Sequence, residues 1–262
     1  MCTIAVALGV HPGLPLVIAA NRDELYARPA RPPELLDRAG GVVGGVDAES
    51  GGTWFAVRRD GAFAAVTNQR AATPRVPGAR SRGEVVRALL LVPDPLAYVR
   101  ALDPGAYSSM NLVFGDAGAA HVAYLRHDTR TCEVAALPPG LHVLCNDRLG
   151  APGFPRGARV EAAIAAALAD HQQASEAALW PALAAALADH QQPAEDDADV
   201  AVEAPLVPAA LARAVRATCI HGPGYGTRSA SLVALAPGRV VRYLHAEGPP
   251  CQAPFHPVAV PS

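Results

Sequence analysis

A cysteine occupies the second position of the chain, where one residue can supply both a nucleophile and a base. Residue two is small, so an aminopeptidase that removes Met1 would leave Cys2 as the first residue. Its free α-amine, with a pKa of about 7.7–8.0, would then accept the proton of its own thiol. Asp23 is placed to orient that amine, and Arg228 to favour the thiolate. Taken alone, a cysteine beside the start codon is usually just a small residue without a chemical role.

Two asparagines extend this chemistry. Asn68 and Asn146 each lie at the end of a predicted strand, and their amides could donate to an oxyanion, with an effect of about 2.7–4 kcal/mol per donor. Asparagine at the end of a strand is also an ordinary turn former. The convergence of these polar residues, rather than any one of them, therefore carries the prediction.

Two predicted hairpins would bring the polar residues together. The first pairs 3–8 with 14–20 around His11-Pro12-Gly13, which places Cys2 opposite Arg22 or Asp23. The second pairs 53–58 with 62–67 around an Asp60-Gly61 turn, which places Thr53 opposite Asn68. Both registers gather polar side chains along one rim of a sheet.

Further elements complete an α+β architecture. Strands are expected at 110–114, 119–125, 141–145, 229–235 and 240–245. Helices are expected at 82–91, 156–170, 176–189 and 208–217, the first capped by Ser81 with Glu84 in a capping box. We predict antiparallel sheets covered by helices, in a single domain over 1–262 with a helical segment at about 156–192.

The composition excludes several classes of protein. With 51% hydrophobic and 18% charged residues, and a net charge of −2, the chain is neither disordered nor a basic nucleic-acid binder. Five cysteines without a CxxC pair and nine histidines without HExxH predict no disulfide framework and no metal site. The uncharged run at 1–21 lacks a basic region and is broken by Pro12 and Pro15, so we expect neither a signal peptide nor a transmembrane segment, and a cytoplasmic location.

Several motifs together carry a family resemblance: Met1-Cys2-Thr3, Asn21-Arg22-Asp23-Glu24, Gly51-Gly52-Thr53-Trp54, Asn68, 107–115 and Tyr225-Gly226-Thr227-Arg228-Ser229. They resemble the NRDE family, also called the transport and Golgi organisation protein 2 family, over nearly the whole chain. That family is similar to N-terminal nucleophile (Ntn) hydrolases of the cholylglycine hydrolase and penicillin V acylase type. The resemblance implies a four-layer αββα sandwich.

The resemblance also implies roles for individual residues. The acylase nucleophile falls on Cys2, the amine-binding aspartate on Asp23, the oxyanion asparagines on Asn68 and Asn146, and the arginine near the nucleophile on Arg228. Candidates for substrate binding are Asn21, Arg22, Thr53 and Trp54. The chain departs from the acylases at Ala20, where they carry an arginine, and strand alternation directs the nearby Arg22 to the face opposite Asp23.

Three functions remain open from the sequence. The first is a hydrolase in which Cys2 attacks an amide or thioester carbonyl of a small acyl substrate through an acyl-enzyme, with no cofactor required. The second is a non-catalytic carrier of haem or another amphipathic metabolite, for which the resemblance provides the motive. Candidate axial ligands of such a cargo are His121, His142, His221 and His245. The third is a scaffold or trafficking partner. With only 5% aromatic residues, the cleft walls are expected to be aliphatic.

Overall fold

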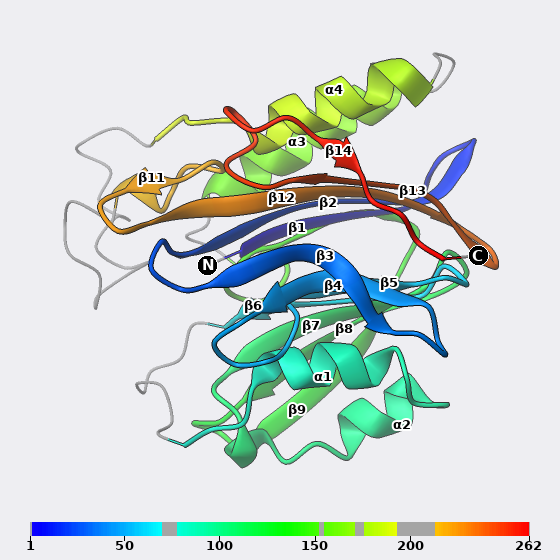
Figure 1. Cartoon of the computed structure of the whole chain (residues 1–262), viewed down its shortest axis with the longest axis vertical. Coiled ribbons are helices and arrows are strands. Elements are labelled where there is room, and N and C mark those ends of the chain that lie inside the picture. Colours follow the sequence, from blue (N-terminus) through cyan, green and yellow to red (C-terminus); the bar gives the residue numbers. More distant parts are fainter. Residues whose placement is uncertain (1, 70–77, 152–154, 171–175, 193–212, 262) are drawn as a thin grey trace.

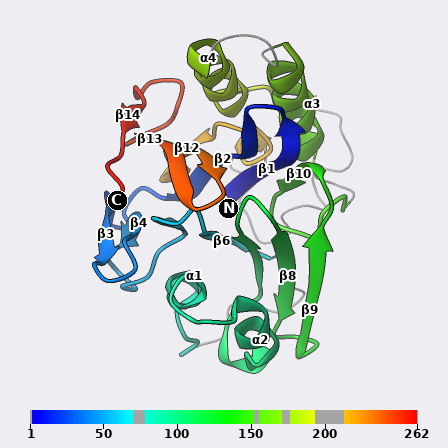
Figure 2. The same cartoon turned by 90° about the vertical axis from the view of Figure 1, so that its right-hand side faces the viewer.

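The computed structural model describes residues 2–69, 78–151, 155–170, 176–192 and 213–261. Two seven-stranded antiparallel sheets pack face to face, with a pair of helices outside each (Figures 1 and 2). The order of layers is helices, sheet, sheet, helices, which confirms the predicted αββα sandwich.

The first sheet contains the first and the last strand of the chain. Its strand order is β10 (Gly140–Leu144), β1 (Cys2–His11), β2 (Leu14–Leu25), β12 (Tyr225–Ala236), β13 (Arg239–Ala246) and β14 (His256–Pro257), and β11 (His221–Gly222) pairs with β12. Two helices cover its outer face, α3 (Pro155–Asp170) and α4 (Glu176–Leu187).

The second sheet follows the chain as a simple meander. Its strands are β3 (Ala30–Asp37), β4 (Val42–Asp47), β5 (Phe55–Arg58), β6 (Phe63–Asn68), β7 (Met110–Gly115), β8 (Ala120–Arg126) and β9 (Thr131–Leu137). Its outer face packs against α1 (Arg82–Leu89) and α2 (Pro95–Arg100), and a short 3-10 helix spans Pro104–Ala106. Strands β3, β4 and β9 and helix α2 were not predicted from the sequence.

Side-chain alternation along β1 explains why both faces of the first sheet are covered. Ile4 and Val6 point into the core between the sheets, whereas Ala5 and Ala7 pack under α3 and α4. Both sets are buried, so the strand reads as a continuous apolar run. Small residues on the outer side let the helices approach the sheet closely, and Cys2 and Thr3 extend the same alternation to the rim.

The register of the first hairpin confirms one of the two predicted pairings. Ile4 lies opposite Ala20 and Cys2 lies opposite Arg22. Directly paired residues point to the same face. Cys2 and Arg22 therefore both face the space between the sheets.

The predicted register of the second hairpin is wrong by one residue. Ala56 pairs with Ala64, and Asn68 pairs with Met110 on β7 instead of facing Thr53. Gly61 adopts a positive φ of 87°. The backbone carbonyl of Arg58 accepts from the Gly61 N–H, and the backbone N–H of Arg58 donates to the Ala62 carbonyl. The connection is thus a three-residue loop with glycine in the left-handed position, which shifts the pairing relative to a two-residue turn.

Three of the four predicted helices agree in position with the structure. Helix α1 begins after Ser81, but the Ser81 side chain makes no capping hydrogen bond, so the predicted capping box does not form. Glu84 instead lies 3.3 Å from the Arg80 guanidinium. Half of the helix expected at 208–217 (residues 208–212) lies outside the described residues, and of the other half only 213–214 are helical. Among the helices that the structure describes, none is both long and apolar enough to span a membrane.

Candidate active site

Cys2 lies at the rim of the sandwich, where β1 and β2 reach the gap between the two sheets. Its partly buried side chain lines a cavity together with Arg22, Asp23, Trp54 and Asn68. Burial raises the pKa of the Cys2 thiol, and the Asp23 carboxylate acts in the same direction, whereas the Asp23 backbone and the Arg22 guanidinium oppose the rise. The thiol therefore requires a base before it can act as a nucleophile at neutral pH.

Asp23 occupies the opposite face of β2 and is almost fully buried. The Thr227 hydroxyl donates to its Oδ1 at 2.7 Å, and the Tyr225 hydroxyl donates to its backbone carbonyl at 2.9 Å. Burial raises the pKa of Asp23, against the opposing influence of Thr227 and of the buried Arg156 guanidinium. The pairing of β12 with β2 fixes this arrangement, because Thr227 lies directly opposite Asp23.

Arg156 is a site residue that the sequence analysis did not single out. It lies in the first turn of α3, is 2% exposed, and donates to Asn146 Oδ1 at 2.5 Å and to the Val215 carbonyl at 2.7 Å. A buried guanidinium needs compensating partners, and Asp23 supplies opposite charge nearby. Sequence could signal it only as an arginine in an otherwise alanine-rich helix.

The two predicted oxyanion asparagines are brought together, but in different roles. Asn146 is buried and donates from Nδ2 to the Asn68 backbone carbonyl at 2.8 Å. Asn68 is exposed, and its residue lines the Cys2 cavity. Asn146 thus connects Arg156 to the end of β6, and Asn68 is the asparagine that faces the cavity.

A group of hydrogen bonds close to Asn68 and Asn146 connects the two sheets. The Thr67 hydroxyl donates to the Cys145 carbonyl at 2.6 Å, and Asn111 Nδ2 donates to Thr67 at 3.0 Å and to the Asp147 carbonyl at 3.1 Å. These bonds join β6 and β7 of the second sheet to the segment after β10 of the first. They hold Asn68 and Asn146 at the same rim as Cys2.

Arg22 lies on the face of Cys2 and projects over the second sheet. Its guanidinium carbon is 4.2 Å from the centre of the Trp54 ring, a cation–π contact, and the residue is 5% exposed. Its Nη1 has no hydrogen-bond partner among the residues that the structure describes. Ala20 occupies the same face two residues earlier and also lines the gap, so Arg22 places a guanidinium on the side of Ala20.

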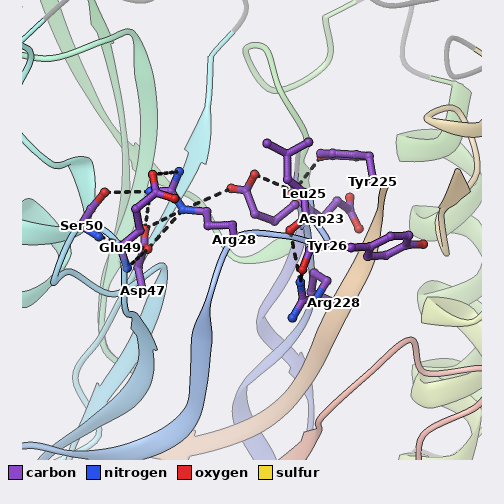
Figure 3. Close-up of polar contacts among 10 residues, drawn as sticks. Asp23, Leu25, Tyr26, Arg28, Asp47, Glu49, Ser50, Tyr225 and Arg228 are labelled. Atoms are coloured by element: carbon purple, nitrogen blue, oxygen red, sulfur yellow. Dashed lines mark hydrogen bonds and ion pairs between the residues drawn. The ribbon is translucent and has the colours of Figure 1, made fainter. Parts of the chain in front are cut away.

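Arg228, which the resemblance assigns to the neighbourhood of the nucleophile, contacts the end of β2. Its Nη1 donates to the carbonyls of Leu25 at 3.2 Å and Tyr26 at 2.5 Å (Figure 3). Arg228 is not among the residues that line the Cys2 cavity. A register shift between Thr227 and Ser229 directs the intervening side chain toward the end of β2. In the structure Arg228 stabilises that strand end.

The remaining predicted binding residues divide between cavity and scaffold. Thr53 and Trp54 line the cavity, although the Thr53 hydroxyl donates inward to the Phe55 carbonyl at 2.9 Å. Asn21 points away from the cavity, and its Nδ2 donates to the carbonyls of Leu187 and Thr218 at 2.9 Å each. Asn21 therefore anchors the end of α4 to β2.

The cavity walls are polar, which contradicts the aliphatic lining expected from composition. Arg28 lies on one wall and bonds Asp47 through Nε and Nη2, the latter at 2.7 Å, with Glu49 at 3.3 Å and Ser50 at 2.8 Å (Figure 3). Although burial alone would raise the pKa of Asp47, Arg28 lowers it overall. Other cavity-lining polar side chains are Glu24, Arg80, Ser81, Arg82 and Ser108.

None of the four histidines considered as haem ligands lines this cavity. His121 stacks on Phe114, His142 contacts the Pro138 carbonyl, and His245 lies between Ser231 and Glu247. His221 lies in a separate cluster of sulfur and nitrogen groups. The site around Cys2 is thus built from arginine, carboxylate, amide and hydroxyl groups.

A sequence profile of the Transport and Golgi organisation 2 family matches residues 1–246. The chain belongs to this family. The bovine Transport and Golgi organization protein 2 homolog is 35% identical over 146 residues, an alignment that spans 52% of each chain. The human homolog is 29% identical over 242 residues, covering 83% of this chain and 81% of the human protein. The first of these alignments thus spans about half the length of the bovine relative.

A solved structure of low sequence identity shares the fold of this chain. A Caenorhabditis elegans ortholog of N-acylethanolamine-hydrolyzing acid amidase superimposes with a TM-score of 0.50 at 11% identity, over 88% of this chain and 92% of the amidase. At this identity the likeness concerns the fold. It agrees with the four-layer architecture of the chain.

Proposed function

We propose that this chain is an N-terminal cysteine hydrolase that cleaves C–N amide or thioester bonds through an acyl-enzyme. The observation that carries the proposal is the position of Cys2. Its thiol faces the cavity directly opposite Arg22, while Asp23 lies on the adjacent position of β2, held by Thr227. A free α-amine at residue two would therefore lie between a nucleophile and a buried carboxylate.

The reaction begins after removal of Met1. The α-amine of Cys2 takes the thiol proton, the sulfur forms a bond to the substrate carbonyl carbon, and the carbonyl oxygen becomes an oxyanion. Collapse breaks the C–N or C–S bond, and the leaving group takes the proton from the amine. Water, deprotonated by the amine, then hydrolyses the Cys2 thioester, releasing a carboxylic acid and restoring the thiol.

The surrounding side chains support each stage of this sequence. In this proposal Asp23 holds the amine, and Asn68, which lines the cavity, donates to the oxyanion. Asn146 and Arg156 act behind them as positioning residues, because each reaches the cavity only through another group. Burial raises the pKa of the Cys2 thiol, and the charge of Arg22 counteracts part of this rise.

The cavity also favours a class of substrate. The Nη1 of Arg22 is buried without a partner among the described residues, and the walls carry further arginines. A buried donor left unpaired is unfavourable. A small acyl substrate with a polar or anionic group near the scissile carbonyl would satisfy it, and neither a metal nor an organic cofactor is needed for the chemistry. Haem as cargo and the cytoplasmic location stay predictions from the sequence.

Turnover with matched variants tests the proposal. Purified chain would be assayed by mass spectrometry against a panel of small N-acyl amides and acyl thioesters, half of them with a carboxylate near the carbonyl. We expect turnover that Cys2→Ala abolishes and that Cys132→Ser, a partly buried thiol elsewhere in the fold, leaves unchanged. Turnover that survives Cys2→Ala would contradict the proposed nucleophile.

A further inference from the structure

Four metal-ligand side chains meet at a place remote from the Cys2 cavity. His190 follows α4, Cys219 and His221 flank Ile220 at the start of β11, and Cys251 lies between β13 and β14. Both sulfurs and one ring nitrogen of each histidine lie within 4.8 Å of one another. Three segments distant in sequence thus contribute two thiols and two imidazoles to one cluster.

The distances within the cluster match the edges of a tetrahedral zinc site. Zn–S bonds of about 2.3 Å and Zn–N bonds of about 2.0–2.1 Å require ligand atoms about 3.8 Å apart for two sulfurs and about 3.6 Å apart for sulfur and nitrogen. The Cys219 and Cys251 sulfurs are 3.6 Å apart, and Nε2 of His221 lies 3.7 Å from the first and 3.3 Å from the second. Three of the ligand atoms already have the required spacing without an ion.

The fourth side chain is held by a contact typical of metal-bound histidines. Nδ1 of His190 lies 3.2 Å from the Cys219 carbonyl, and the His190 and His221 rings are 4.9 Å apart. A histidine whose one nitrogen donates to a backbone carbonyl keeps the other nitrogen available as a ligand. Cys219 is buried and the other three residues are exposed, so an ion can enter from solvent.

We propose that His190, Cys219, His221 and Cys251 bind one Zn²⁺ ion in a tetrahedral Cys₂His₂ site. Two thiolates and two imidazoles suit zinc, and the two thiolate charges balance the ion. The four protein ligands complete the coordination, so the site is structural. Cys251 lies beyond residue 246, where the match to the family profile ends.

The site stabilises a segment that supports Asp23. The N–H of Ile220, between the two ligands Cys219 and His221, donates to Thr227 Oγ1 at 2.9 Å. Thr227 in turn donates to Asp23. The preceding Thr218 carbonyl accepts from Asn21 on β2. Zinc would thus fix residues 218–221 against the end of β2 and join the C-terminal segment to the same point.

Metal binding to the whole chain tests the proposal. Protein purified with reductant would be stripped with a chelator and titrated with Zn²⁺ against a chromophoric indicator, and separately with Co²⁺. We expect one equivalent of zinc, the intense visible bands of tetrahedral cobalt and a sulfur-to-cobalt charge-transfer band. Bound zinc should raise the melting temperature, because it binds only the folded state strongly.

Variants separate this site from adventitious binding. Cys251→Ser and His221→Ala alter exposed residues and should leave the fold intact, while lowering zinc affinity at least tenfold and weakening the charge-transfer band. Cys132→Ser is the matched control and should bind as the unaltered chain does. The proposal is overturned by the absence of saturation near one equivalent, by an octahedral cobalt spectrum, or by unchanged binding in Cys251→Ser. A disulfide between Cys219 and Cys251, detected as the loss of two hydrogen masses, would also overturn it.

Discussion

Arg22 and Asp23 are adjacent on β2, and their side chains lie on opposite faces of the first sheet. Arg22 lies over Trp54 on the side of Cys2, and Asp23 lies under Thr227 on the side of α3. Strand alternation produces this division. A single dipeptide therefore supplies a cation to the face of the thiol and a carboxylate to the face on which the amine would be held.

Removal of the Arg22 charge should slow alkylation of Cys2. Arg22 lowers the pKa of the Cys2 thiol against the effect of burial, so Arg22→Leu should raise that pKa and decrease the thiolate fraction at fixed pH. We expect a 3- to 10-fold slower alkylation at pH 8, since one pKa unit changes the thiolate fraction about tenfold. Arg31→Leu, at an exposed arginine paired with Glu34, is the control. An unchanged rate in Arg22→Leu would refute this electrostatic role.

Loss of the Thr227 hydroxyl should destabilise the fold around Asp23. Thr227→Val leaves the Ile220 N–H and Asp23 Oδ1 each without its present partner. Buried polar groups left unsatisfied cost about 1–3 kcal/mol, and we expect a decrease of this size in the free energy of unfolding in urea. Thr227→Ser keeps the hydroxyl and should lose less than half as much. Equal losses in the two variants would show that the methyl group, not the hydroxyl, matters.

Arg156 should contribute more to stability than an exposed arginine. Arg156→Met removes the donor to Asn146 and the positive charge near Asp23, which leaves buried polar groups uncompensated at about 3 kcal/mol or more. Arg148→Met breaks an exposed ion pair with Glu133 and should cost less than about 1 kcal/mol. Chemical denaturation of both variants checks the ranking. Similar losses would mean that Arg156 is not a buried counter-charge.

Asp23 should make stability depend on pH in a defined direction. Burial raises its folded-state pKa above the unfolded value, so its favourable contribution is complete below the unfolded pKa and is lost as pH rises through the folded one. Asp23→Asn removes this loss. The free energy of unfolding of Asp23→Asn relative to the unaltered chain should therefore increase from about pH 4 upward, measured by urea denaturation in steps of one pH unit. A difference that stays constant or decreases over this range would contradict the raised pKa.

Local patterns were sufficient to predict the first hairpin and the rim location of Cys2. The turn at His11-Pro12-Gly13 limits the pairing of β1 and β2 to two registers, and Cys2 does lie opposite Arg22. The motif resemblance supplied the four layers. The predicted register of the second hairpin is wrong by one residue because Gly61 takes the left-handed conformation. Glycine permits this conformation but does not require it.

Contacts between distant segments could not be predicted in this way. Arg156 and Asn146 meet because α3 packs beside the end of β10, and Arg228 turns outward because β12 changes register near Thr227. In the proposed zinc site, His190 and Cys219 are 29 positions apart, and His221 and Cys251 are 30 positions apart. These separations match none of the short ligand spacings by which metal motifs are found in a sequence. Each depends on tertiary packing, to which periodicity and motif spacing are insensitive.

The central claim is that Cys2, freed from Met1, is an activated nucleophile. Intact mass before and after a brief, substoichiometric treatment with a thiol-directed electrophile tests it most directly. The experiment compares the unaltered chain with Cys2→Ala, and peptide mapping separates an adduct on Cys2 from one on the exposed Cys251. We predict that Met1 is absent and that one adduct forms only when Cys2 is present. Retained Met1, or equal labelling of both proteins, would contradict the account.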